Sequence, residues 1–274
     1  MKKLTKSIIR GILKTRKPNS HKGDFGHALI IAGSKSKMGA AIIASKACIR
    51  AGVGMLSVNI PEQERLALQV SIPEAMSVFR GDTIKDSFNY SALAIGPGIG
   101  TQKDAVNILK HIINTFTNPI LLDADALNII ADNNELLKKL PKETVITPHP
   151  KEFDRLFGKH ENDNERKLSA VLFAKKYNIV IVLKGHQTLV TYNDDSYINT
   201  TGNAGLAKAG SGDALSGIIT AFLAQGYLPI NAALLGVYIH GLAADITLKN
   251  QSMESMLITD IINNLGKTFF YLRK

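Results

Sequence analysis

Short apolar runs rich in β-branched residues alternate with longer segments of helical period along the first two thirds of the chain. These runs are apolar almost throughout, a pattern typical of strands that are buried on both faces of a sheet. The pattern predicts strands over residues 27–33, 54–60, 92–96, 119–125, 144–148 and 179–185.

Between these strands, apolar residues recur every three or four positions, as on the buried face of a helix. Helices are therefore expected over residues 38–52, 101–116, 150–157 and 165–177. The alternation of strand and helix predicts βαβ units. The expected fold class is α/β, with three layers: a doubly wound, mostly parallel sheet flanked by helices.

The last part of the chain follows a different pattern. Residues 188–200 predict a hairpin that turns at Asn193–Asp195, and the chain is then expected to be helical to its end, over residues 213–226, 230–248 and 254–272. No repeat, linker or shift in composition divides the sequence, so residues 1–274 are expected to form a single domain.

The chain is basic, with 33 Lys and Arg against 23 Asp and Glu and a net charge of +10. A basic surface attracts anions, but the sequence has no arginine-rich tract and no Trp, which disfavours nucleic acid as the partner. No apolar run predicts a membrane span, and the basic first residues do not resemble a signal peptide. The single cysteine, Cys48, fits a buried helix face. We therefore expect a cytoplasmic protein.

Glycine-rich and polar loops follow most of the predicted strands. In an open parallel sheet, functional residues gather at these carboxyl ends. Any one such loop could simply be a tight turn that needs glycine, but together the loops indicate a ligand site. They cover residues 32–41, 96–100, 123–128, 147–153 and 184–188.

The segment "NAGLAKAGSGDALSG", residues 203–217, surrounds one carboxylate with small residues. Gly210, Ser211 and Gly212 precede an apolar helix pattern, so their N–H groups are predicted to form an anion hole at a helix N-terminus. Asp213 could simply complement the helix dipole. Beside a phosphate-binding turn it is instead well placed to take a proton from a hydroxyl group, and we predict this catalytic role.

The motifs "HKGDFGHALIIAGS", "GPGIG", "LLDADALN", "TPHPKEFDRL", "LKGHQT" and "NAGLAKAGSGDALSG" occur in this order. In order and content the chain resembles the ADP/ATP-dependent NAD(P)H-hydrate dehydratases of the ribokinase-like superfamily, from about Ser20 to beyond His240. The resemblance implies dehydration of the S epimer of hydrated NAD(P)H, called NAD(P)HX, to NAD(P)H. ADP or ATP would be converted to AMP or ADP and phosphate, with Mg²⁺ as cofactor.

The resemblance also implies roles for particular residues. Those that would bind NAD(P)HX are Ala40, Gly100, His149 and Asp213, and those that would bind the nucleotide are Lys184, Gly185, His186, Gln187, Thr188 and Gly212. A cation at Lys184 and a hydroxyl at Thr188 suit phosphate groups.

Some of these positions have structural alternatives. His149 could instead serve a rigid turn between Pro148 and Pro150. Asp125 could cap the following helix, or Asp123 and Asp125 could reach a phosphate-bound Mg²⁺. The metal ligands therefore stay open.

The resemblance favours a homo-oligomer, with a tetramer expected. Only about twenty residues precede the first motif, so no fused epimerase domain is expected and a separate protein would interconvert the epimers. Two alternatives stay open: a ribokinase-like kinase of the hydroxyethylthiazole or hydroxymethylpyrimidine type, and a non-catalytic nucleotide-binding sensor.

Overall fold

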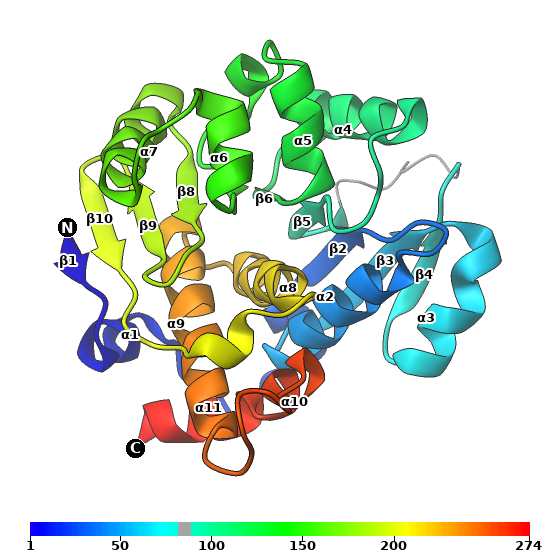
Figure 1. Ribbon diagram of the computed structural model, residues 1–274. Helices are drawn as coiled ribbons and strands as arrows, with labels where there is room; N and C mark the ends of the chain where they lie inside the picture. The colour runs from blue at the N-terminus through cyan, green and yellow to red at the C-terminus, as the bar shows by residue number, and fades with distance from the viewer. Residues whose placement is uncertain (82–88) are drawn as a thin grey trace.

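The computed structural model describes residues 1–81 and 89–274. In these residues the strands form one ten-stranded sheet in the order β1-β10-β9-β8-β7-β6-β5-β2-β3-β4 (Figure 1). The strands are β1 (Lys2–Lys3), β2 (His27–Ile31), β3 (Met55–Ile60), β4 (Met76–Phe79), β5 (Ala92–Ile95), β6 (Ile120–Leu122), β7 (Val145–Ile146), β8 (Val180–Leu183), β9 (Leu189–Tyr192) and β10 (Asp195–Ile198).

The sheet is mostly parallel, as predicted. β2 pairs in parallel with β3 on one side and with β5 on the other. β9 runs antiparallel to both β8 and β10, which confirms the hairpin. From β2 the chain builds outward to β4, then returns to β5 beside β2 and builds toward the opposite edge. Ligands of open α/β sheets bind at the carboxyl ends of the strands next to such a switch point.

Helices cover both faces of the sheet. They are α1 (Lys6–Ile12), α2 (Met38–Arg50), α3 (Arg65–Ser71), α4 (Lys103–Thr115), α5 (Asp125–Asp132), α6 (Pro150–Phe157), α7 (Asp163–Tyr177), α8 (Ser211–Ala224), α9 (Pro229–Thr247), α10 (Ile258–Asn263) and α11 (Leu265–Arg273).

Strand β2 shows how the two faces are divided. Ala28 and Ile30 pack into a core shared with α2, α8 and α9, whereas Leu29 and Ile31 pack into a second core with α4 to α7. Alternate residues of a strand point to opposite faces, so a strand between two helical layers must be apolar throughout. Cys48 lies in the first core, where burial raises the pKa of its thiol. The predicted three-layer architecture is confirmed.

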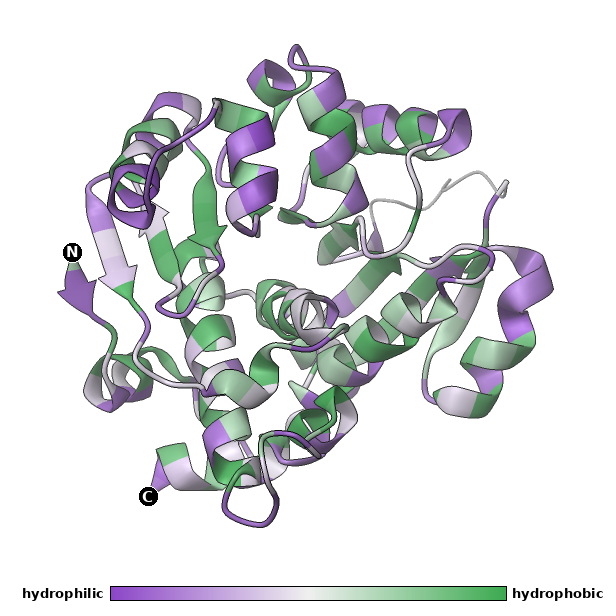
Figure 2. Ribbon diagram, in the orientation of Figure 1, coloured by the Kyte–Doolittle hydropathy of each residue, from purple (hydrophilic) through white to green (hydrophobic). Residues whose placement is uncertain are grey.

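Two long apolar helices, α8 and α9, form the centre of the helical layer that contributes to the first core (Figures 1 and 2). Every residue of α8 from Ala214 to Ala224 is buried. α9 is long and apolar enough to cross a membrane, but 72% of its most hydrophobic window is buried inside the protein. Burial between the sheet and neighbouring helices explains this composition.

The sequence pattern does not predict β1, α1, α3 or β4. α1 and α3 have seven residues each, too few for a clear helical period. The predicted strand over residues 119–125 ends at Leu122, because Ala124 has φ 48° and α5 begins at Asp125. The helix predicted over residues 254–272 is interrupted at Asn264, which ends α10 and precedes α11.

Close packing of α8 on α2 depends on Gly217. A Cβ atom at this position would collide with the backbone carbonyl of Ala44 in α2. Because the obstacle is backbone rather than a flexible side chain, the two helices would have to separate.

We expect Gly217→Ala to lower the free energy of unfolding by about 3 kcal/mol, since overpacking a rigid contact forces backbone shifts. Gly266→Ala is the matched control, because Gly266 lies exposed in α11 with nothing within 4 Å of an added Cβ. Alanine should stabilise that helix by a few tenths to about 1 kcal/mol. Urea denaturation of both variants measures the difference, and equal stabilities would contradict the packing argument.

Candidate active site

The "GSGD" segment opens α8, as predicted. Gly210 is the N-cap, with φ 91°, and Ser211, Gly212 and Asp213 form the first turn. The Ser211 N–H donates to the Lys208 carbonyl at 3.2 Å, so it does not contribute to the predicted anion hole in this structure. Among the described residues, the N–H groups of Gly212 and Asp213 have no acceptor. These two free donors, at the positive end of the helix dipole, can hold an anion.

The Asp213 carboxylate lies partly buried in this turn. No hydrogen bond or ion pair engages it in the described part of the chain. Burial raises its pKa to about 6, with a further contribution from the charge of Asp123 and a smaller one from Asp125, against the opposing effect of Lys184. A carboxylate with a raised pKa and no partner is a candidate general base.

Lys184, at the end of β8, forms the centre of a buried polar network. Its Nζ donates to Asp123 Oδ1 at 2.8 Å and lies 3.8 Å from Glu152 Oε2. The Ser216 hydroxyl in α8 donates to the other Asp123 oxygen at 2.6 Å. Burial alone would lower the pKa of Lys184, but the charges of Asp123, Glu152 and Asp213 outweigh it and raise the pKa. The network fixes the position of a permanent cation beside the first turn of α8.

Gly212 is needed because Lys184 approaches so closely. A Cβ atom at Gly212 would lie 3.3 Å from Lys184 Nζ and 3.8 Å from Asp123 Oδ2. An added Cβ would therefore crowd the Lys184 ammonium group, which would have to shift by a few tenths of an ångström. The glycine keeps the cation and the helix N-terminus on one ligand surface.

The glycine loop after β5 meets the start of α2. A Cβ atom at Gly98 would lie 3.1 Å from the Ala40 Cβ, so the two segments are in contact. Gly100 has φ 80° and donates its N–H to Asp125 Oδ2 at 2.8 Å. Lys37 Nζ lies 3.5 Å from the same oxygen. The structure thus brings Ala40 and Gly100, two of the residues predicted to bind substrate, to one part of the switch point.

Asp125 does not cap α5. The N-cap is Ala124, and Asp125 is the first helical residue, with its carboxylate directed to Gly100. Both oxygens of Asp123 are engaged by Lys184 and Ser216, so Asp123 could bind a metal only by losing these partners. Across residues 1–81 and 89–274, no group of three or more His, Cys, Asp or Glu is arranged to hold a metal ion.

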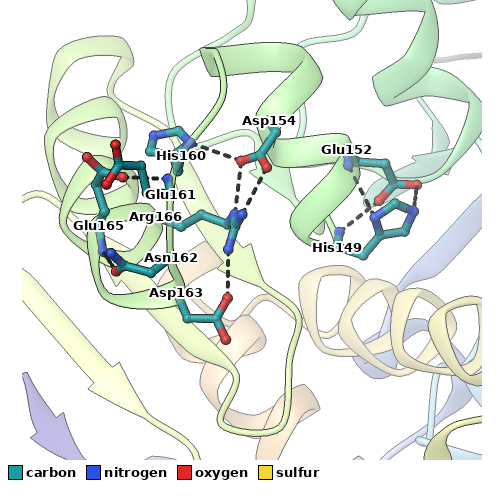
Figure 3. Close-up of polar contacts among 9 residues, drawn as sticks. All are labelled: His149, Glu152, Asp154, His160, Glu161, Asn162, Asp163, Glu165 and Arg166. Carbon is teal, nitrogen blue, oxygen red and sulfur yellow. Dashed lines mark hydrogen bonds and ion pairs between the residues drawn. The ribbon is translucent and has the colours of Figure 1, made fainter.

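His149 is the N-cap of α6 and forms a capping box with Glu152 (Figure 3). The Glu152 N–H donates to His149 Nδ1 at 3.1 Å, and the His149 N–H donates to Glu152 Oε2 at 2.8 Å. His149 thus has the structural role considered from the sequence, but nearly half of its side chain is exposed. Through Glu152 it is also connected to Lys184.

A cavity of about 450 Å³ lies beside this network. It is lined by the loop after β8, including Lys184, Gly185, His186 and Thr188, and by Ser211 and Gly212 of α8. Gln187 does not line it but faces a separate, smaller cavity beside Arg166. The structure therefore brings together the residues predicted to bind nucleotide, apart from Gln187.

His240 of α9 also lines this cavity and is almost fully buried. Burial lowers its pKa to about 4, so its imidazole is neutral near pH 7. Its Nε2 has no hydrogen-bond partner in the part of the chain that the structure describes. The 450 Å³ cavity thus has a cation at one wall and a neutral, buried imidazole at another.

Sequence reasoning missed Glu152, Ser216 and Lys37. Their side chains contact His149, Asp123 and Asp125, respectively. For Glu152 a signal was present, since a residue with a side-chain acceptor followed three positions later by Glu is the capping-box spacing. Ser216 and Lys37 have no such local signal, because their partners lie far away in sequence.

Arg166 was missed as well. It binds Asp154 through two 2.9 Å hydrogen bonds and joins α7 to α6 (Figure 3).

Comparisons with known proteins identify the family of the chain. Residues 28–267 match the sequence model of the family described as NAD(P)H-hydrate dehydratase. The ADP-dependent (S)-NAD(P)H-hydrate dehydratase of Bacillus subtilis is 34% identical over 277 residues, with 97% of this chain and 98% of that protein covered. The bifunctional NAD(P)H-hydrate repair enzyme of Moorella thermoacetica is 33% identical over 278 residues, covering 96% of this chain. The chain spans about half, 52%, of that relative's length.

Solved structures show the same fold. An ADP/ATP-dependent NAD(P)H-hydrate dehydratase from Bacillus subtilis, co-crystallized with ATP and Mg²⁺, matches with a TM-score of 0.88, 33% identity and coverage of 99% of this chain and 98% of that one. A ribokinase-like superfamily protein from Enterococcus faecalis also gives a TM-score of 0.88, with 30% identity and coverage of 99% and 95%.

A doubly wound sheet, with a free carboxylate and two free N–H groups at the start of a central helix, defines a ribokinase-like α/β protein. Within that class, the chain belongs to the NAD(P)H-hydrate dehydratase family.

The raised pKa of Asp213 predicts an effect on stability. Its folded-state value of about 6 exceeds the ordinary 3.8, so the ionised carboxylate destabilises the fold. This cost is absent below about pH 4, develops as the pH rises through the interval between the two pKa values, and is complete above about 6. We expect Asp213→Asn to raise the free energy of unfolding at pH 7 by about 2 kcal/mol.

Denaturant unfolding at pH 4 and pH 7 measures this effect. The stabilisation should be present at pH 7 and largely absent at pH 4. Asp132→Asn is the control, because Asp132 is an exposed carboxylate in α5 that forms no ion pair with another described residue. A variant that is equally stable to the wild type at both pH values would show that Asp213 is not electrostatically strained.

Proposed function

We propose that the protein is a nucleotide-dependent dehydratase that converts the S epimer of NAD(P)HX to NAD(P)H, with ADP or ATP as phosphate donor. The proposal rests mainly on the Asp213 carboxylate and the adjacent N–H groups of Gly212 and Asp213, none of which has a partner among residues 1–81 and 89–274. Membership of the NAD(P)H-hydrate dehydratase family supports the substrate class.

The first step is transfer of a phosphoryl group to the ring hydroxyl of NAD(P)HX. Hydroxide is a poor leaving group, and phosphorylation converts it into a good one. Asp213 takes the hydroxyl proton as the oxygen attacks the terminal phosphorus of the nucleotide, and the bond to the nucleotide's bridging oxygen breaks. The N–H groups at the start of α8 stabilise the charge on the transferring group because they are already aligned.

The second step is elimination. The lone pair of the reduced pyridine nitrogen expels phosphate by breaking the carbon–oxygen bond, and loss of a proton from the adjacent ring carbon gives NAD(P)H. The products are then AMP or ADP and phosphate. The phosphoryl group is carried only transiently on the substrate, which distinguishes a dehydratase from a kinase that uses the same anion hole.

The residues divide between two ligands in this proposal. Ala40 and Gly100, at the switch point, and His149, at the start of α6, bind NAD(P)HX. The residues of the 450 Å³ cavity, with Lys184 and Thr188 among them, bind the nucleotide. Gln187 lines the neighbouring smaller cavity, which shares Lys184, Gly185 and His186 with the 450 Å³ cavity.

Mg²⁺ enters the proposal only as an ion bound to nucleotide phosphates, because the described residues offer no ready-made metal site. We further propose that the protein acts in the cytoplasm as a single domain, assembles as a homotetramer, and works with a separate epimerase. The family match argues against a thiazole- or pyrimidine-type kinase and against a sensor without catalysis.

The direct test incubates the protein with (S)-NADHX, Mg²⁺ and either ADP or ATP, and follows the return of NADH absorbance. Asp213→Asn should lower kcat about 10³-fold while nucleotide binding persists, since it removes a general base and leaves the N–H groups in place. Asp132→Asn should retain full activity.

No recovery of NADH with either nucleotide, in folded wild-type protein, would overturn the dehydratase. A phosphorylated alcohol as the final product would indicate the kinase alternative instead. Wild-type turnover by Asp213→Asn would remove Asp213 from the chemistry without affecting the assignment of substrate.

The pH dependence of kcat/KM provides a separate test. A general base must be ionised, so kcat/KM should fall tenfold per pH unit below the free enzyme's pKa of about 6. The charge of Asp125 contributes to raising the pKa of Asp213, so Asp125→Asn should move this limb to lower pH while keeping an acceptor for the Gly100 N–H. An acid limb that is identical in wild type and Asp125→Asn would exclude Asp213 as its source.

A further inference from the structure

A cavity of about 820 Å³ lies away from Asp213, at the opposite end of α8. It is formed by the segment that joins α1 to β2, by the C-terminal ends of α2 and α8, and by α11. α8 has 14 residues, so the two ends of this helix are about 20 Å apart. None of the residues predicted to bind NAD(P)HX or nucleotide lines this cavity.

The lining of this cavity is strongly basic. Its cationic side chains are Lys14, Arg16, Lys17, Arg50 and Arg273, against one carboxylate, Asp24, whose ion-pair partner is His21. In residues 1–81 and 89–274, none of the five cations has a carboxylate within 4.0 Å. A concave space lined by charges of one sign focuses their electric field and attracts ions of the opposite sign.

Helix capping accounts for two of the five cations. Lys14 Nζ donates to the carbonyl of Gly226 at 3.0 Å, just beyond the end of α8. Arg16 donates to the carbonyl of Gly52, just beyond α2, and stacks on the Phe25 ring at 3.6 Å. Each helix C-terminus carries about half a negative charge. With these and Asp24 taken into account, roughly three positive charges remain without compensation.

Positively charged side chains lie close together in this cavity and repel one another. Burial lowers the pKa of Arg16, and the charge of nearby Arg273 lowers it further. Lys17, Arg50 and Arg273 form no hydrogen bond with another described residue through their side chains. An anion among these groups would offset their mutual repulsion and use their free donors.

We propose that this cavity is a second ligand site, which binds a small polyanion carrying two or more phosphate groups. Arginine side chains match phosphate oxygens in geometry as well as charge. The cavity is a concave space of about 820 Å³, the size of a small-molecule site, whereas a membrane surface or a nucleic-acid duplex requires a broad exposed face. This site is independent of the reaction proposed above.

The binding site is located by amide hydrogen exchange of the protein, measured with and without inorganic tripolyphosphate at constant ionic strength. Tripolyphosphate should slow exchange in residues 13–25 and in the last turn of α2. Binding to the N–H groups at the start of α8 would protect a different peptide, so the two sites are read separately. The concentration dependence of protection in residues 13–25 gives the affinity.

The variant Lys17→Gln/Arg50→Gln/Arg273→Gln should weaken this protection at least tenfold, since it removes cations whose side chains form no hydrogen bond with another described residue. Lys138→Gln/Lys139→Gln/Lys159→Gln is the control, which removes the same charge from exposed lysines outside the cavity and should bind as wild type. Melting curves confirm that both variants are folded.

Absence of protection in residues 13–25 would overturn the proposal. Equal loss of protection in the two triple variants would also overturn it, because the attraction would then depend only on net charge. Protection by anionic vesicles or duplex DNA without protection by tripolyphosphate would assign the basic surface to a macromolecule and reject the small-molecule site.

Discussion

The buried contact of Lys184 with Asp123 is the interaction on which the candidate active site depends. It joins the end of β8 to the end of β6, and through Ser216 and Glu152 it extends to α8 and α6. Removing one partner from a buried ion pair leaves an uncompensated charge, which costs several kcal/mol. The network therefore fixes one arrangement of four elements around the first turn of α8, and the position of Asp213 follows from it.

The charges of this network also explain the chemistry expected of Asp213. The Lys184 ammonium group pairs with Asp123 and Glu152 rather than with Asp213. Its charge therefore lowers the pKa of Asp213 by less than burial and the charge of Asp123 raise it. Asp213 is then left partly buried and without a partner, and its pKa rises to about 6. Neighbouring carboxylates in one site thus have different roles: Asp123 holds structure, Asp125 orients a glycine loop, and Asp213 is free to accept a proton.

Much of the fold was predictable because strand burial and helix period are local patterns. The order of motifs placed the candidate site at the carboxyl ends of the strands, and "GSGD" placed a carboxylate in the first turn of α8. What could not be predicted depends on contacts between distant segments. Nothing near Ser216 indicates that its hydroxyl binds Asp123, and nothing in "KGHQT" indicates that Gln187 lines a different cavity from Gly212. Short elements such as β1 and α1 likewise depend on tertiary packing rather than on their own residues.

The two edge strands of the sheet, β1 and β4, affect whether a strand of another molecule can add to it. In the described part of the chain, β1 is only Lys2–Lys3 and β4 has four residues, so each edge strand offers few unpaired backbone groups. Strands this short are poor templates for a further strand from another molecule, and lysine at the margin makes such an addition still less favourable. A chain with a ten-stranded, mostly hydrophobic sheet is thereby protected against open-ended growth of that sheet.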